Sequence, residues 1–348
     1  MLSLPRYHAG GVRAAMQRQQ QETGPQTGAP VYAALDLGTN NCRLLVVRPS
    51  DGGFDVLDSF SRIVRLGEGL HSTGRLSEQA IERAIAALHV CAGKIRQRRV
   101  TKMRCVATDA CRRADNCAGF VARVKRETGV RLEIIGTREE AALAAAGCTP
   151  LLDPSCGRAL VFDIGGGSSE LMWLAVKGQG TARMLDSISL PWGVARMAET
   201  FGSDRISDRA YRAMTAAVTP WLRRFDEANC ISAAVAAGRV QMLGTSGPVT
   251  IVAGLHLGLV RYRRDLVDGC SLAFDDLDVV SDRLRRLDRE GRARLPCIGR
   301  DRADMAVGGC AILEAICRMW PVGSIRVADR GVREGILFRM IARDGGTA

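Results

Sequence analysis

Two segments of this sequence, 127 positions apart, have the same physical layout. Residues 35–45 and 162–172 each contain an apolar stretch, an Asp, one apolar residue, a turn of Gly and small polar residues, and a second apolar stretch. Such turns leave backbone N–H groups accessible, because glycine has no Cβ, and accessible N–H groups suit phosphate oxygens. The repeat therefore predicts two related lobes that face each other across a cleft and hold a phosphorylated ligand.

The second copy of the turn carries the stronger signal. Its three glycines are followed by hydroxyl and acidic side chains, in the order Gly165, Gly166, Gly167, Ser168, Ser169 and Glu170. Glycine weakens strands and loses the most conformational entropy on ordering, so close approach of the backbone to a ligand is the favoured explanation. A simple tight hairpin needs only two special residues. Asp163, which precedes the turn, is placed to hold a metal ion or to orient a water molecule.

The first copy is a weaker signal by itself, because Gly38, Thr39 and Asn40 also fit an ordinary hairpin turn. Its pairing with the second copy makes the phosphate-binding interpretation specific. A third segment again follows an apolar strand and presents small hydroxyl residues, in the order Gly244, Thr245, Ser246 and Gly247. This segment either lines a phosphate or nucleotide, or is an ordinary loop.

Charged side chains are expected near the mouth of the cleft. Glu139 and Glu140 open a helix that is predicted over 137–147. The helix dipole favours acids at this position, so a structural role is the alternative to catalysis. Inside a cleft with bound phosphate, such a carboxylate would act as a general base toward water. Arg112 would neutralise charge on the transferred phosphoryl group, and spacing alone does not distinguish it from Arg113.

Length and composition favour a globular protein with an anionic partner. The 348 residues are enough for two domains. The formal charge of +12 favours polyphosphate, a nucleotide, a nucleic acid or an anionic membrane, although an Arg-rich composition alone also makes a protein basic. Aromatic residues make up only 5% of the chain, which disfavours single-stranded nucleic acid as the ligand. No segment approaches the roughly 18 consecutive apolar residues of a membrane span.

The cysteines indicate the compartment. The chain has twelve Cys but no CxxC pair, and its four His add no zinc-ligand spacing. Scattered thiols without a secretory signal predict a reducing, cytoplasmic location. Residues 1–29 are basic, rich in Gln and Gly, and predicted to be disordered.

Strands alternate with helices along the chain, which predicts an α/β fold. Segment 149–157 contains two prolines, an Asp and a Ser, and is the predicted hinge. We therefore expect a first lobe over 30–149 and a second lobe over 150–335. The closing segment 336–348 is expected to pack back on the first lobe.

These motifs resemble the exopolyphosphatase/guanosine pentaphosphate phosphohydrolase family of the actin-like, sugar-kinase and Hsp70 ATPase superfamily. The similarity runs from about residue 31 to residue 338. The segments that carry it are 36–40 with Arg43, 107–108 with Arg112 and Asn116, 139–141, 163–168, 189–193, 244–247 and 302–309. The Glu-Glu-Ala and Ser-x-Pro-x-Gly segments discriminate best, because the triple glycine recurs across the superfamily.

The resemblance implies two actin-like lobes and release of terminal orthophosphate from polyphosphate or guanosine pentaphosphate, with Mg²⁺ or Mn²⁺. It implies that Glu140 activates water and that Arg112 binds phosphate. The acids expected at the metal and the attacking water are Asp36, Asp163 and Glu170. The residues that match phosphate-binding segments are Gly38, Thr39, Asn40, Asn41, Arg43, Gly165, Gly166, Gly167, Ser168, Ser169, Gly244, Thr245, Ser246 and Gly247. A homodimer is also expected from the family.

Three positions depart from the common pattern of that family. Asn41 and Asp109 stand where Ser is frequent, and Pro248 stands where Thr usually follows the glycine. Asp109 adds negative charge beside a polyanion, and Pro248 lacks an N–H that a phosphate would accept. Longer relatives add helical domains that extend a polyphosphate channel, so this shorter chain is expected to prefer short polymers.

Two other functions remain open. One is an ATP-dependent small-molecule kinase, because the same fold with glycine-rich hairpins serves both chemistries. The other is a catalytically weak regulatory protein that binds guanosine tetra- or pentaphosphate.

Overall fold

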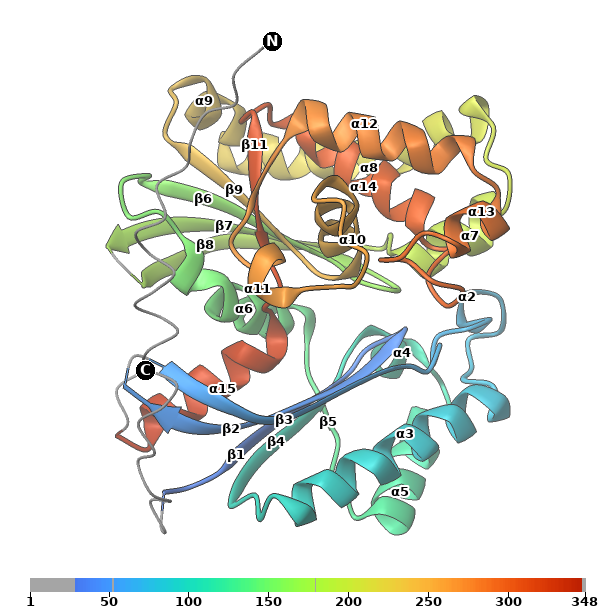
Figure 1. The fold of residues 1–348 in the computed structure, drawn as a ribbon, viewed down its shortest axis with the longest axis vertical. Helices are drawn as coiled ribbons and strands as arrows, with labels where there is room; N and C mark the ends of the chain where they lie inside the picture. The colour runs from blue at the N-terminus through green and yellow to red at the C-terminus, as the bar shows by residue number, and fades with distance from the viewer. Residues whose placement is uncertain (1–28, 52, 179, 346–348) are drawn as a thin grey trace.

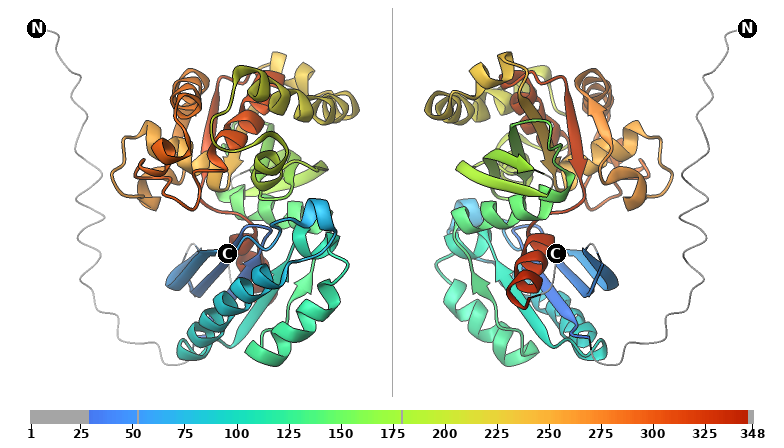
Figure 2. Two further views of the ribbon diagram at one scale, coloured as in Figure 1. Left: turned by 90° about the vertical axis from the view of Figure 1, so that its right-hand side faces the viewer. Right: turned by 90° about the vertical axis from the view of Figure 1, so that its left-hand side faces the viewer.

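The structure is a computed structural model that describes residues 29–51, 53–178 and 180–345. Two β-sheets lie one above the other, and each carries helices on its outer side (Figure 1). Views from the two sides show the same division into a lower and an upper lobe (Figure 2). The disorder predicted for residues 1–29 falls almost entirely outside the described residues.

The first sheet has the strand order β3-β2-β1-β4-β5. These strands are β1 (Tyr32–Leu37), β2 (Asn41–Ser50), β3 (Gly53–Ile63), β4 (Lys102–Ala107) and β5 (Glu133–Ile134). β1 is central, because it pairs antiparallel with β2 and parallel with β4. Helices α3 (Glu78–Gln97) and α5 (Cys117–Thr128) cover the outer face and bury an apolar core against it. Ser77 caps α3 by accepting a hydrogen bond from the Ala80 N–H at 3.2 Å.

The second sheet repeats this arrangement. Its order is β10-β11-β9-β6-β7-β8, with β6 antiparallel to β7 and parallel to β9. The strands are β6 (Arg158–Ile164), β7 (Ser169–Gly178), β8 (Thr181–Leu190), β9 (Val240–Thr245), β10 (Ser271–Ala273) and β11 (Ser324–Ala328). Its outer helices are α8 (Asp208–Asn229), α10 (Gly247–His256), α12 (Phe274–Arg286) and α14 (Ala306–Met319). The predicted α/β fold, with one sheet and its helices in each of two lobes, is confirmed.

Two helices, α6 (Thr137–Cys148) and α15 (Val332–Arg343), lie between the sheets. They share one apolar core with both sheets, which includes Leu45 from β2 and Met172 from β7. The helices cross so closely that a Cβ on Gly335 would lie 1.9 Å from the Leu143 carbonyl oxygen. Glycine is therefore required at the crossing. This central layer places the start of α6 beside the cleft.

The remaining described elements are short. They are α2 (Leu70–Thr73), α4 (Asp109–Arg113), the 3₁₀ turn η2 (Thr149–Leu151), α7 (Val194–Phe201), α9 (Ile231–Ala236), α11 (Arg264–Val267) and α13 (Arg289–Ala293). α15 contacts β1 and β2, and the Tyr32 hydroxyl donates to Asp344 Oδ2 at 2.6 Å. The lobe boundaries themselves stay predictions. Among the described residues, no helix combines the length and the apolar character that a membrane crossing needs.

Candidate active site

The two repeated turns have the same backbone geometry. The Gly38 N–H donates to the Asn41 carbonyl oxygen at 2.9 Å, and the Gly165 N–H donates to the Ser168 carbonyl oxygen, also at 2.9 Å. The flanking strands pair in the same register, since Asp36 lies opposite Arg43 and Asp163 lies opposite Glu170. The sequence repeat is therefore a structural repeat of strand, turn and strand.

The two turns meet across the cleft between the lobes. A Cβ on Gly166 would lie 3.0 Å from the Asn40 Cβ, and a Cβ on Gly167 would lie 2.9 Å from Thr39 Oγ1. The predicted residues that line the cavity at this junction are Asp36, Gly38, Thr39, Asn40, Asn41, Arg43, Glu140, Asp163, Gly165, Gly166, Gly167, Ser168, Glu170, Ser246 and Gly247. The structure thus brings most of the predicted site together.

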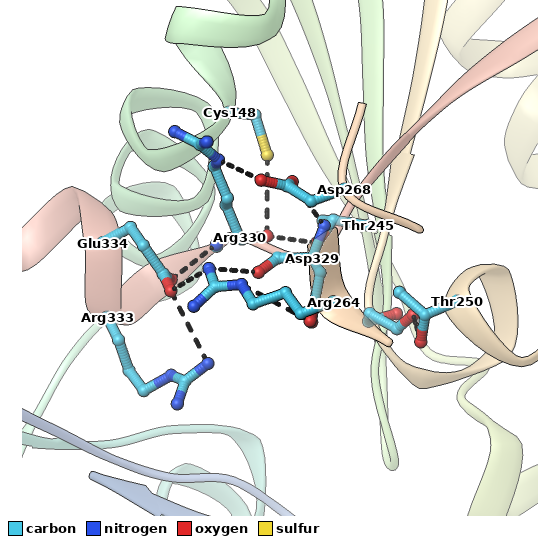
Figure 3. A network of polar contacts seen from close by, with 11 residues as sticks. Cys148, Thr245, Thr250, Arg264, Asp268, Asp329, Arg330, Arg333 and Glu334 are labelled. Atoms are coloured by element: carbon cyan, nitrogen blue, oxygen red, sulfur yellow. Dashed lines mark hydrogen bonds and ion pairs between the residues drawn. The ribbon is translucent and has the colours of Figure 1, made fainter. Parts of the chain in front are cut away.

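Four predicted site residues lie outside the cavity lining. Ser169 is buried and donates its hydroxyl to the Trp192 carbonyl oxygen at 2.6 Å. Gly244 packs against the ring of Phe162. Thr245 donates to the Arg330 carbonyl oxygen, within a network of polar contacts beside the start of α15 (Figure 3). Arg112, the fourth, lies behind Glu140.

Glu140 lies in the first turn of α6 and faces the cavity. Arg112 Nη1 donates to Glu140 Oε2 at 2.6 Å and to the Ile135 carbonyl oxygen at 3.0 Å. Burial, together with the nearby charge of Glu170, raises the pKa of Glu140 well above its ordinary value, while Arg112 opposes that rise. Arg112 therefore orients a buried carboxylate, and the phosphate-binding role expected of it stays a prediction.

Three further acids line the inner end of the cavity. Burial raises the pKa of Asp36 to about 6 and that of Glu170 to about 7. Burial also raises the pKa of Asp163. The Glu170 carboxylate accepts hydrogen bonds from Ser168 Oγ at 2.7 Å and Ser189 Oγ at 2.9 Å, which fixes its orientation. The cavity therefore gathers three carboxylates whose negative charges are only partly stabilised by nearby positive charges and hydrogen-bond donors.

This donor set would suit a divalent cation that keeps several of its waters. Within the described residues, no three acidic, His or Cys side chains are close enough together to form a complete metal cage. Mg²⁺ instead typically uses one or two carboxylates together with waters and substrate phosphate oxygens. Asp163 and Glu170, which face each other across one strand pair, supply hard oxygen donors at the second turn.

The segment after β9 opens a helix directly. Ser246 precedes α10 with a φ of 82°, a region that non-glycine residues rarely adopt. Its hydroxyl donates to the Ile164 carbonyl oxygen at 2.7 Å and accepts from the Ile164 N–H at 3.1 Å, so the strained residue joins the third segment to the second turn. Pro248 lies in the first turn of α10, where a missing N–H costs little.

Several cavity residues were not in the predicted set. Thr108, Asp109 and Arg302 contribute polar groups, and burial together with the nearby Arg43 lowers the pKa of Arg302. The apolar wall consists of Val194, Pro248, Ile251, Val252, Leu284, Met305, Ala306, Cys310 and Val332. Arg302 lies within segment 302–309, which carries the family resemblance, so that segment was an available signal. Apart from Met305 and Ala306 of the same segment, the apolar wall comes from separate parts of the chain and has no local sequence signature.

Comparison with known proteins gives the family. The chain matches the Ppx/GppA phosphatase family over residues 45–344. It belongs to this family. The resemblance inferred from its motifs is therefore confirmed.

Several Ppx/GppA relatives are similar over most of this chain. The guanosine-5'-triphosphate,3'-diphosphate pyrophosphatase of Vibrio parahaemolyticus is 29% identical over 90% of this chain and 60% of its own length. The corresponding protein of Aeromonas salmonicida is 28% identical over 91% of this chain and 60% of its own length. The chain thus spans about 60% of the length of these curated relatives.

Solved Ppx/GppA structures match over nearly their full length. A family member from Aquifex aeolicus is 27% identical with a TM-score of 0.75, and an exopolyphosphatase-like protein is 30% identical with a TM-score of 0.80. Each alignment covers 91% of this chain and 99% of the other. An exopolyphosphatase from Cytophaga hutchinsonii, 23% identical with a TM-score of 0.81, shares the fold.

Proposed function

We propose that this protein is a metal-dependent phosphoanhydride hydrolase that releases terminal orthophosphate from short inorganic polyphosphate, from guanosine pentaphosphate, or from both. The observation that carries the proposal is Glu140, a carboxylate at the start of α6 that lines the same cavity as both glycine turns. The names of the family relatives, a guanosine-5'-triphosphate,3'-diphosphate pyrophosphatase and an exopolyphosphatase-like protein, support it.

In the proposed mechanism, backbone N–H groups of the two turns and the Arg43 guanidinium hold the terminal phosphates. Glu140 accepts the proton of a water molecule aligned with the scissile bond. Its raised pKa makes it a stronger base once ionised, and Arg112 keeps its carboxylate directed into the cavity. Asp163 and Glu170 would hold Mg²⁺ or Mn²⁺, which when bound neutralises charge on the phosphate oxygens.

One observation favours a nucleotide among the substrates. The cavity has an apolar wall from α10, α12 and α14, including Ile251, Leu284 and Met305, beside the phosphate-binding turns. Inorganic polyphosphate has no apolar group to place there, whereas a nucleoside has a planar base. Guanosine pentaphosphate therefore belongs in every assay beside polyphosphate.

The deciding experiment measures orthophosphate release from both substrates, at several polyphosphate lengths and with Mg²⁺ or Mn²⁺. Glu140→Gln should lower kcat by about 100-fold to 10,000-fold, because general-base catalysis contributes about that factor. Glu139→Gln is the matched control, since Glu139 is the adjacent acid but pairs with Arg104 at 2.7 Å and is 41% exposed. Undiminished release by the Glu140→Gln protein would refute the assignment of the base.

A regulatory protein that binds guanosine tetra- or pentaphosphate is the second candidate. Asp109 supports it, because this carboxylate adds negative charge to the cavity lining and one of its oxygens has no hydrogen-bond partner. The same assay separates the two functions. Tight nucleotide binding without turnover in either metal would favour regulation, and phosphorylation of an added acceptor by ATP would indicate the kinase alternative.

A further inference from the structure

Residues 64–69 connect β3 to α2 and lie between the first turn and the second lobe (Figure 1). The Arg65 N–H donates to the Asn40 carbonyl oxygen at 3.1 Å. The Gly67 N–H donates to the Thr39 carbonyl oxygen at 2.9 Å. Because both acceptors belong to the first turn, these backbone hydrogen bonds make the segment move together with that turn.

The backbone at Arg65 is unusual and firmly held. Arg65 has a φ of 47°, in the left-handed region that residues other than glycine rarely adopt. Arg83 of α3 fixes the chain on both sides of this peptide, because its Nε donates to the Val64 carbonyl oxygen at 2.9 Å and its Nη2 donates to the Arg65 carbonyl oxygen at 3.3 Å. Conformations of this kind persist where the surrounding contacts determine them, and they cluster at functional positions.

The Arg65 side chain contacts the second lobe. Its Nη1 lies 2.9 Å from Asp304 Oδ2, and its Nη2 donates to the Asp301 carbonyl oxygen at 3.2 Å. The Asp304 side chain is 14% exposed, and its Oδ1 is buried without a hydrogen-bond partner. Within the described part of the chain, no other cationic side chain lies within ion-pair distance of Asp304. Arg65 therefore compensates the charge of a mostly buried carboxylate on the opposite lobe.

The second-lobe end of this contact belongs to the wall of the catalytic cavity. Arg302 and Met305, which are close neighbours of Asp304 in the chain, both line that cavity. The Ala303 carbonyl oxygen accepts a hydrogen bond at 3.0 Å from Nε of Arg292, a fully buried arginine. This stretch is therefore fixed within the second lobe, and the ion pair joins it to the first turn.

A second contact joins the same segment to the second turn. The Gly69 N–H donates to Glu199 Oε1 at 3.2 Å, and Glu199 lies on α7. The start of α7 is attached to the second turn, because the Val194 N–H donates to the Gly165 carbonyl oxygen at 3.0 Å. The segment thus contacts both a wall of the cavity and a helix that is bonded to the opposite turn.

We propose that Arg65 is a positioning residue that holds the first turn against the second lobe through Asp304, and that residues 65–69 form the latch of the closed cleft. The inference rests on the proposed function, in which both turns hold the terminal phosphates. A phosphate chain that contacts both turns binds the closed form more tightly than an open form, so a latch that favours closure raises affinity. Without Arg65, Asp304 would lose its counter-ion, which favours separation of the lobes.

The first test is calorimetric titration of the full chain with tripolyphosphate in a chelator, which removes the metal that the proposed hydrolysis needs. Arg65→Gln and Asp304→Asn should each weaken the binding by about 10-fold, roughly the worth of one hydrogen bond between charged groups. Arg99→Gln is the matched control and should change nothing. Arg99 is an exposed arginine that follows α3 and has a similar φ of 51°.

Small-angle X-ray scattering without ligand measures the closure itself. At equal thermal stability, Arg65→Gln and Asp304→Asn should each increase the radius of gyration relative to the Arg99→Gln protein. Arg65→Lys should give an intermediate value, because lysine keeps the charge but lacks the guanidinium fork that reaches two acceptors. A radius of gyration that is the same in all these variants would overturn the proposal.

The double variant Arg65→Gln/Asp304→Asn distinguishes one latch from two independent effects. If the two residues act as a pair, the double variant should bind tripolyphosphate about as weakly as either single variant. Losses of affinity that multiply would contradict the pairing. If the wild type binds no tripolyphosphate, the scattering comparison alone decides. A wild type that releases no orthophosphate would refute the proposed hydrolysis, whereas the scattering result would still support or overturn the latch.

Discussion

The turn of the first lobe has Thr39 and Asn40 where the turn of the second lobe has Gly166 and Gly167. Both turns close with the same hydrogen bond, so the backbone does not explain this difference. The contact between the lobes does, because the side chains of Thr39 and Asn40 lie against the two glycines. One turn presents side chains and the other presents bare backbone, which lets the two turns approach each other closely.

The strands beside the two turns differ in charge. In the first lobe Asp36 lies opposite Arg43, so that turn carries one charge of each sign. In the second lobe Asp163 lies opposite Glu170, and both are acids. The two copies of the repeat therefore share the same backbone geometry but differ in the charges of the residues beside the turn. In the proposed mechanism both turns hold phosphate through their backbone, and the added acid beside the second turn would also hold a cation.

The largest effect is expected from the acidic side of the second turn. Glu170→Gln should lower kcat by about 100-fold or more, because it removes a charge that would hold the metal and orient water. The measurement is orthophosphate release at saturating Mg²⁺ and over a Mg²⁺ titration. A weaker apparent affinity for Mg²⁺ should accompany the loss.

Ser189→Ala is the control for this change. It removes the 2.9 Å hydrogen bond to Glu170 but leaves the carboxylate charge in place. We expect a loss of about 10-fold, at the low end of the range for a partner that only orients a ligand. Equal losses in the two variants would mean that orientation, and not charge, distinguishes the second turn from the first.

Equivalent glycines should differ in their effect on stability. A Cβ on Gly165 would lie 2.8 Å from the Ser168 carbonyl oxygen, whereas a Cβ on Gly38 would lie 3.6 Å from the Asn41 carbonyl oxygen. Gly165→Ala should therefore lower the free energy of unfolding by about 1–3 kcal/mol, as overpacking does. Gly38→Ala should change it by less than about 1 kcal/mol.

Urea unfolding of both alanine variants measures the difference directly. Equal destabilisation would show that the two turns are under the same steric constraint, contrary to the contacts described above. Since Gly38 is outside the left-handed backbone region, no conformational penalty is expected there beyond the contact itself.

The sequence predicted the parts of the site that depend on local requirements. The run of three glycines, and the turn of similar layout 127 positions earlier, reflect the close approach that the backbone must allow at these turns. Such a local requirement is visible in the sequence. The alternation of strands and helices likewise gave the fold class. Glu140 was predicted as a site residue from its position at the start of a helix and from the family resemblance.

The parts that were not predicted come from contacts between distant segments. The pairing of Arg112 with Glu140 depends on how α4 and α6 meet, and the contact of Asp109 with Gly167 depends on how the lobes close. The third segment was expected from the resemblance to bind phosphate, with an ordinary loop as the alternative from its residues alone. Gly244 packs on Phe162 and Thr245 donates to the Arg330 carbonyl oxygen, because β9 continues through Thr245 and only the residues after the strand, Ser246 and Gly247, reach the cavity.

A dependence of stability on pH should also separate the two turns. Burial raises the pKa of Asp36 to about 6 and that of Glu170 to about 7, so the folded protein holds protons that the unfolded chain has released. The free energy of unfolding should therefore fall as pH rises from about 5 to 7, by at most about 1.4 kcal/mol per pH unit for each group. Urea unfolding in a chelator at several pH values measures this slope. Asp36→Asn should flatten it mainly below pH 6, and Glu170→Gln should flatten it up to pH 7. Stability that increased across this range would show that neither carboxylate is destabilised by burial, and the contrast between the turns would then rest on geometry alone.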